Sequence, residues 1–307
     1  MSSTPSRKLS LAAHRRGVLA VLAVAGLASA AALALLGGTS GEADRPLAGV
    51  PATDPGPIHV HALGVDPGDR SLLLATHTGL FRLPPGARDA ARVSDLRQDT
   101  MGFTIVGPGR YLGSGHPDAR DRLPPLLGLI SSEDAGRSWR PVALLGEADF
   151  HVLRAAGPTL YGVDSSSGRL LASSDAGKSW SRAAEPGQIL DLVPRPGEPQ
   201  RLVATAAGGL EQGLYASADG GRTWRRRGPA LGLLAWPAAD RLYLVDAAGT
   251  VLLSRDEGRS FAPRGELGGQ AAAFFAAGRE ELYAALHDGR IVRSANGGTT
   301  WAVRARP

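Results

Sequence analysis

One octapeptide, of the form Ser-x-Asp-x-Gly-x-Ser/Thr-Trp, recurs five times in this sequence. Its copies occupy residues 132–139, 173–180, 217–224, 254–261 and 294–301. The fourth copy has Phe261 in place of Trp, and the fifth has Asn296 in place of Asp. Positions 134, 175, 219, 256 and 296 are separated by 41, 44, 37 and 40 residues. A repeat of about 40 residues among short apolar segments predicts a β-propeller or a similar repeat array.

The residue types of the octapeptide are those of a tight turn that closes a β-hairpin. An Asp carboxylate accepts hydrogen bonds from backbone N–H groups of its own turn, and glycine adopts a positive φ without steric cost. The aromatic residue is large enough to pack between neighbouring sheets. We therefore predict structural roles for three positions of each copy, namely Asp134, Gly136 and Trp139, then Asp175, Gly177 and Trp180, then Asp219, Gly221 and Trp224, then Asp256, Gly258 and Phe261, and finally Asn296, Gly298 and Trp301.

Residues 57–307 alternate between short apolar runs and turns rich in Gly, Pro and Asp, without a convincing helical period. They divide into six units of about 42 residues, each with four strands, of which the third and fourth are joined by the octapeptide. The first unit has Leu-Pro-Pro-Gly at residues 83–86 instead. The sequence thus predicts an all-β fold, a six-bladed β-propeller. Inner strands are expected at residues 58–65, 101–106, 150–155, 189–194, 231–236 and 271–276.

The N-terminal residues have the composition of an export or anchoring segment. Residues 1–16 contain four Lys or Arg and no acidic residue, and residues 17–38 carry no charge. Such an apolar run is long enough to span a bilayer, with the basic flank in the cytoplasm and the following domain outside. Two outcomes remain open: an uncleaved anchor in the cell membrane, or a signal peptide cleaved after Ala30 to give a secreted protein. Residues 39–56 are expected to be a linker.

Charge and cysteine content narrow the classes of partner. The formal net charge is +5, and removing the four positive charges of residues 1–16 leaves 5 − 4 = +1 for the rest. No basic run with interleaved aromatic residues occurs in the part predicted to be exported, so a nucleic-acid partner is not expected. The sequence has no cysteine, which excludes disulfides and a lipoprotein anchor.

Histidines gather in the first three predicted blades. His59 and His61 begin the first inner strand, His77 and His116 end second strands, and His151 begins the third inner strand. We expect His59 and His61 to face the same side, because side chains two residues apart do so in a strand. Converging at the mouth of the ring, these imidazoles would form a zinc or copper site, with Asp99, Asp149 or Met101 nearby. A thioether ligand would favour copper. Alternatively, they are independent polar residues at strand ends.

The octapeptide resembles the Asp-box (BNR) repeat of sialidases and related propellers. Further segments, Ile-His-Val-His-Ala-Leu-Gly-Val at residues 58–65, Ala-Thr-His-Thr-Gly-Leu-Phe at 75–81, Met-Gly-Phe at 101–103 and Gly-His-Pro at 115–117, resemble a group of exported bacterial propellers called glycosyl-hydrolase-like or sialidase-like. The resemblance covers nearly all of residues 57–307. It implies the fold and an extracytoplasmic location, but no substrate.

The residues that sialidases use are not matched. That family carries a Phe/Tyr-Arg-Ile-Pro motif at its first substrate-binding arginine, and the nearest string here, Phe-Arg-Leu-Pro at residues 81–84, is offset onto a third strand. Four of the five tyrosines follow a Leu within a strand, which is typical of core residues. A glycosidase of another kind requires two carboxylates at a suitable separation. The carboxylates near predicted strand ends are Asp99, Asp118, Asp149, Asp164, Asp191 and Asp246.

Three hypotheses for function follow. The first is a binding protein of the cell envelope whose funnel is lined by His59, His61, His77, His116 and His151, with a metal, a glycan or an envelope protein as ligand. The second is a divergent glycosyl hydrolase, and the third is an assembly or protein-interaction propeller. Converging imidazoles would favour a metal, paired carboxylates with arginines an enzyme, and an exposed apolar patch a protein partner.

Overall fold

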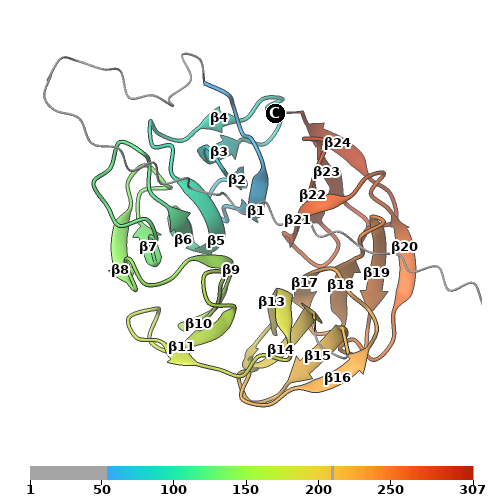
Figure 1. Ribbon diagram of the computed structural model, residues 1–307. Helices are drawn as coiled ribbons and strands as arrows, with labels where there is room; N and C mark the ends of the chain where they lie inside the picture. The colour runs from blue at the N-terminus through green and yellow to red at the C-terminus, as the bar shows by residue number, and fades with distance from the viewer. Residues whose placement is uncertain (1–53, 209–210, 307) are drawn as a thin grey trace, which may run out of the picture. The chain divides into compact units, whose positions relative to one another are not determined.

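The computed structural model describes residues 54–208 and 211–306, which form a six-bladed β-propeller (Figure 1). Each blade is a four-stranded antiparallel sheet, and the described residues contain no helix. The predicted all-β propeller is therefore confirmed. The predicted flank at residues 1–16, the apolar segment at 17–38 and nearly all of the 39–56 linker lie outside the described residues. Within the described part of the chain, no helix is long and apolar enough to cross a membrane.

The strands follow one another in chain order around the ring. Blade 1 contains β1 (Val60–Val65), β2 (Leu72–Thr76), β3 (Gly79–Leu83) and β4 (Ala91–Arg92). Blade 2 contains β5 (Asp99–Gly107), β6 (Arg110–His116), β7 (Leu129–Ser132) and β8 (Arg140–Ala143). Blade 3 contains β9 (Phe150–Ala156), β10 (Thr159–Asp164), β11 (Arg169–Ser173) and β12 (Ser181–Arg182).

The second half of the ring has the same plan. Blade 4 contains β13 (Gln188–Arg195), β14 (Glu198–Ala207), β15 (Gly213–Ser217) and β16 (Arg225–Gly228). Blade 5 contains β17 (Leu233–Ala238), β18 (Arg241–Val245), β19 (Thr250–Ser254) and β20 (Ala262–Glu266). Blade 6 contains β21 (Ala271–Ala276), β22 (Leu282–Leu286), β23 (Ile291–Ser294) and β24 (Ala302–Ala305).

All six inner strands lie where the apolar runs predicted them, with shifts at their ends. The first begins at Val60 instead of residue 58, because His59 has a φ of 52° and the β1–β2 register shifts between Val60 and Ala62. A positive φ breaks the alternation of an extended strand. His59 therefore lies just before the strand instead of opening it.

The ring closes without a shared strand, because all four strands of every blade are consecutive in the chain. Blades 1 and 6 are held together by side-chain packing instead. One apolar cluster combines Leu72 and Phe81 of blade 1 with Tyr283 and Ile291 of blade 6. Polar contacts reinforce the junction: Arg304 donates to the carbonyl of Pro84 at 2.7 Å, and Arg70 forms an ion pair with Glu281 at 2.5 Å.

The octapeptide turns share one hydrogen-bond network. In the second copy, Asp175 Oδ1 accepts from the backbone N–H of Ser179 at 2.9 Å, and Asp175 Oδ2 accepts from the Ser179 hydroxyl at 2.6 Å. The Ser173 hydroxyl donates to Asp175 and accepts from the backbone N–H of Gly177. These hydrogen bonds, chiefly that from the Ser179 hydroxyl, lower the pKa of Asp175 to about 2. The first, third and fourth copies contain the corresponding bonds. In the fifth copy, Asn296 Oδ1 accepts from the backbone N–H of Thr300, but the Asn296 amide Nδ2 donates to the Thr300 hydroxyl.

The glycine of each octapeptide rests on the preceding blade. A methyl group built on Gly177, whose φ is +87°, would lie less than 3 Å from the Leu129 side chain in blade 2. Gly136, Gly258 and Gly298 meet Leu80, Leu214 and Val251 of the preceding blades in the same way. The glycine is thus required by its positive φ and by the neighbouring blade. The aromatic residue packs nearby: the Trp180 indole donates to the Gly177 carbonyl at 3.0 Å and lies 4.8 Å from the Phe150 ring.

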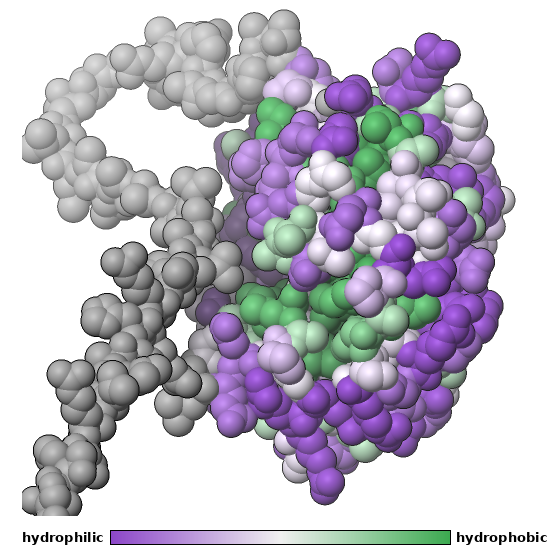
Figure 2. Space-filling view, turned by 90° about the vertical axis from the view of Figure 1, so that its right-hand side faces the viewer, coloured by the Kyte–Doolittle hydropathy of each residue, from purple (hydrophilic) through white to green (hydrophobic). Residues whose placement is uncertain are grey.

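The propeller surface is mostly hydrophilic. Figure 2 shows hydrophobic patches among polar residues on the side that carries β20 and β24. Over the described chain, the large hydrophobic side chains that are exposed are Ile58, Leu123 and Val303. Val303 belongs to β24, the outer strand of blade 6.

We expect Gly177→Ala to destabilise the propeller by about 3 kcal/mol, from the strain of a positive φ and from overpacking against Leu129. The matched control is Gly168→Ala, because Gly168 has a φ of +70° but nothing within 4 Å of an added methyl group. The stability of the control should fall by only about 1 kcal/mol, from the strain of the positive φ alone. Urea unfolding of both variants measures the difference. Equal losses would show that the contact between blades carries no energy.

Candidate metal centre

The predicted histidines lie at strand ends on one side of the ring, and the octapeptide turns lie at strand ends on the other side. We call each of these two sides an edge of the blades. In an antiparallel blade, the start of the first strand and the end of the second strand share one edge. His61 lies near the start of β1, His77 follows β2, His116 ends β6 and His151 lies near the start of β9. The octapeptides join third to fourth strands and therefore lie at the other edge. Position in the blade thus brings these histidines to one edge of blades 1, 2 and 3.

His61, His77 and Asp99 form the tightest group, which we call the His61 site. Their ligand atoms all lie within 4.8 Å of one another, and among the described residues no other His, Asp or Glu triplet does so. His61 Nε2 is 3.3 Å from Asp99 Oδ1, and His77 Nδ1 is 2.8 Å from Asp99 Oδ2. His61 Nε2 and Asp99 Oδ1 are both buried and neither has a hydrogen-bond partner. Two unsatisfied ligand atoms thus face each other within the His61 site.

His59 and Met101 lie beside this site. The His59 ring is 6.2 Å from the His77 ring, centroid to centroid, but His59 does not belong to the triplet. Its positive φ is uncommon for a residue other than glycine and is found more often at functional sites. Met101 lines the same central cavity as His61. Two imidazoles and a carboxylate are a donor set that suits zinc, and a thioether within reach would favour copper.

The remaining two predicted histidines form a separate cluster around a carboxylate, which we call the Asp149 cluster. His151 Nε2 is 2.8 Å from Asp149 Oδ2, and His116 Nε2 is 3.6 Å from the same oxygen. Asp149 is only 3% exposed. Burial opposes its charged form, but hydrogen bonds from His151 and Ser165 outweigh burial and hold the pKa of Asp149 below its usual value. Asp149 is therefore an ionised, buried carboxylate at neutral pH.

The structure thus divides four of the five predicted imidazoles between two groups that lie next to each other, with His59 outside both. Asp99 and His116 are paired residues of the β5–β6 ladder, and one belongs to each group. The sequence suggested both carboxylates as neighbours of the histidines and as candidates for a glycosidase pair, but not as the centres of two groups. Their central position follows from the inner strands: Asp99 begins β5, and Asp149 immediately precedes β9.

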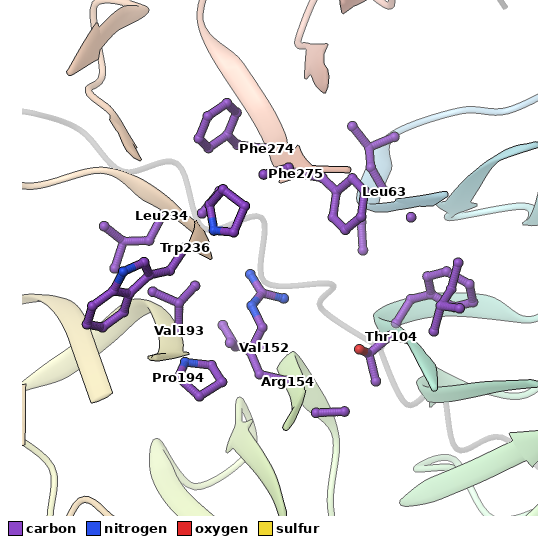
Figure 3. A pocket seen from close by; sticks show the side chains of 18 of the residues that line it. Leu63, Thr104, Val152, Arg154, Val193, Pro194, Leu234, Trp236, Phe274 and Phe275 are labelled. Carbon is purple, nitrogen blue, oxygen red and sulfur yellow. The ribbon is translucent and has the colours of Figure 1, made fainter. Parts of the chain in front are cut away.

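A central cavity of about 1050 Å³ runs between the inner strands of all six blades and reaches His61, Met101 and His151. Its wall is about equally polar and apolar, and Figure 3 shows Arg154 among side chains such as Leu234, Trp236 and Phe275. Arg154 forms an ion pair of 2.7 Å with Asp191. Asp191 is 3% exposed and also accepts from the backbone N–H of Leu234. No pattern in the sequence predicts this pair, because Arg154 and Asp191 lie on different strands and are far apart in the chain.

Three of the five tyrosines have structural roles. Tyr111, Tyr161 and Tyr243 are fully buried, and their hydroxyls donate to Asp66, Pro199 and Arg279 respectively. Wherever a carboxyl pKa is shifted within the described chain, it is shifted downward, as for the Asp118 carboxyl, whose charged form accepts hydrogen bonds from Arg120. A glycosidase needs one carboxyl with a raised pKa as general acid. The electrostatics therefore add no support to glycoside hydrolysis.

Comparison with solved structures shows the same fold at low sequence identity. The GH74 enzyme of Niastella koreensis has a TM-score of 0.58 and 14% identity over 81% of this chain, and YCF48 from Cyanidioschyzon merolae has 0.51 and 14% over 82%. A structure of the nidogen/laminin complex has 0.56 and 14% over 73%. The matches cover 45%, 86% and 88% of those chains, so this chain spans about half the length of the GH74 enzyme. No protein-family model and no curated protein matches.

We expect Arg154→Met to destabilise the propeller by about 2 kcal/mol, because it leaves the charge of Asp191 buried without its cation. Half-exposure of Arg154 keeps the loss below that of a fully buried pair. The control is Arg140→Met, since the ion pair between Arg140 and Glu133 is exposed on both sides and should change stability by less than about 0.5 kcal/mol. Urea unfolding compares the two. Similar losses would contradict a structural role for the cavity pair.

Proposed function

We propose that this protein is a metal-binding β-propeller of the cell envelope that holds zinc or copper at the His61 site. The observation that supports this most directly is the pair of buried atoms His61 Nε2 and Asp99 Oδ1, which lie 3.3 Å apart without hydrogen bonds. Buried polar atoms without partners are costly in a folded protein. Ligand atoms on a tetrahedral zinc ion are separated by about 3.3 Å, since each lies about 2.0–2.1 Å from the metal. A cation between these atoms would satisfy both.

The composition of the site indicates what a bound metal would do. His61, His77 and Asp99 supply three protein ligands. Metal sites with three protein ligands keep a position open for water or another molecule, whereas structural zinc sites are closed by four. The His61 side chain also lines the central cavity. A metal at this site would therefore be reachable by a ligand entering the cavity.

We propose that the propeller acts outside the cytoplasm. The N-terminal residues support this: residues 17–38 would either anchor the chain in the cell membrane or be cleaved after Ala30 to release it. The sequence resemblance to exported sialidase-like propellers points the same way. Glycans and envelope proteins are then the ligands available to the cavity and its rim.

A protein-interaction role is the second candidate. One structure of the same fold is a nidogen/laminin complex, which shows this architecture within a protein assembly. The hydrophobic patches of Figure 2 are the surface on which such a role would depend. Glycoside hydrolysis is suggested by the GH74 enzymes of the same fold, but no raised carboxyl pKa is found among the described residues to support it.

Metal content tests the first proposal. The full-length chain is purified in mild detergent and offered zinc or copper. We expect it to bind about one more metal ion per chain than the His61→Ala/His77→Ala variant does. His287→Ala is the matched control, because His287 follows β22 as His77 follows β2, but no other imidazole lies in its blade. Elemental mass spectrometry after dialysis provides the measurement.

Two outcomes would contradict the proposal. One is a wild-type chain that retains neither zinc nor copper. The other is a double variant whose metal content equals that of the His287→Ala control. A thermal melt of each variant shows that any loss of metal comes from the missing ligands and not from unfolding.

A further inference from the structure

We propose that the Asp149 cluster is a second, separate cation site, formed by His116, Asp149 and His151. It neighbours the His61 site but shares no residue with it. The proposal rests on three features of the cluster: the tautomer of His116, the burial of Asp149, and the place of His151. It does not depend on metal binding at the His61 site.

The hydrogen bond of His116 determines which ring nitrogen is free. His116 Nδ1 is 2.9 Å from the carbonyl oxygen of Pro125. A carbonyl only accepts, so Nδ1 carries the hydrogen, and in the neutral ring Nε2 holds a lone pair. Metal-bound histidines commonly donate their other N–H to a backbone carbonyl in this way, which orients the ring and makes the ligand nitrogen more basic.

That lone pair faces an anion. His116 Nε2 is 3.6 Å from Asp149 Oδ2, which is too long for a hydrogen bond and brings two electron-rich atoms together. Asp149 Oδ1, on the same carboxylate, is buried and has no hydrogen-bond partner. A cation resolves both features, because it attracts the lone pair and the carboxylate at once. The 3.6 Å separation is close to the distance of about 3.3 Å between two ligands of one zinc ion.

His151 would complete the set of ligands. Its Nε2 now pairs with Asp149 Oδ2 at 2.8 Å, and Ser165 donates to the same oxygen at 2.7 Å. A metal that binds His151 Nε2 displaces the hydrogen from that nitrogen, and the neutral ring carries its one hydrogen on Nδ1 instead. The side chains of His116 and His151 are 43% and 41% exposed, so they have room to turn toward a common ion.

The three ligand atoms of the Asp149 cluster do not all lie within 4.8 Å of one another, whereas those of the His61 site do. Side chains must therefore reorient before a metal binds, and that reorganisation reduces affinity. We infer that the cluster binds zinc more weakly than the His61 site. Zinc titration should then show two successive steps.

Calorimetric titration of the full-length chain in detergent with zinc tests the proposal. We expect two steps in the wild type, and loss of the weaker one, by at least about tenfold in affinity, in His116→Ala and in Asp149→Asn. The stronger step should persist in both variants, which also shows that they are folded. Conversely, His61→Ala/His77→Ala should keep only the weaker step.

The outcomes separate the two proposals. A single step that disappears with His61→Ala/His77→Ala and is unchanged by Asp149→Asn would overturn the second site and leave the first. A single step that disappears with Asp149→Asn alone would support the second site and overturn the first. Two steps that both weaken with either set of variants would show one shared site, and would overturn the claim that the Asp149 cluster binds separately.

Discussion

Contact between successive blades is the constraint on which this propeller depends. A four-stranded blade cannot bury both of its faces alone, and no strand is exchanged between the first and last blades to fasten the ring. The octapeptide supplies the contact on the outer part of the blades. It places a glycine with positive φ, such as Gly177, directly on an aliphatic side chain of the blade before it. The hydrogen bonds of the turn hold the backbone in the conformation that lets the glycine pack against the preceding blade.

This arrangement leaves the opposite edge of each blade free for chemistry. Three aspartates near the starts of inner strands differ in how their carboxylates are hydrogen-bonded at this edge. Asp191 is satisfied by Arg154 and by two backbone N–H groups, and it links blades 4 and 5. Asp99 and Asp149 each keep one buried oxygen without a partner. Similar positions therefore serve structure in blade 4 and remain unsatisfied in blades 2 and 3, beside imidazoles.

The spacing of the octapeptide was enough to predict the ring, because each copy marks one blade and the fold follows from the period. The histidines were harder to place. Their strand-end positions predicted that they share an edge, but not that His59 has a φ of 52° and precedes β1. Nor did sequence show that Asp99 and Asp149 would divide the imidazoles into two groups, since that depends on the β5–β6 register and on contacts between blades. The ion pair of Arg154 with Asp191 connects adjacent inner strands and has no local signature.

Two adjacent sites would account for a feature that one site leaves unexplained. A single cation at the His61 site would satisfy Asp99 but leave the Asp149 carboxylate buried, charged and short of partners. Protonation of His116 at Nε2 would supply the missing positive charge, although the 3.6 Å gap to Asp149 is long for the charge-assisted hydrogen bond that would result. A metal ion fits that gap without closing it. We therefore propose that a cation, and not a direct hydrogen bond, joins His116 to Asp149, beside the His61 site on blades 1 and 2.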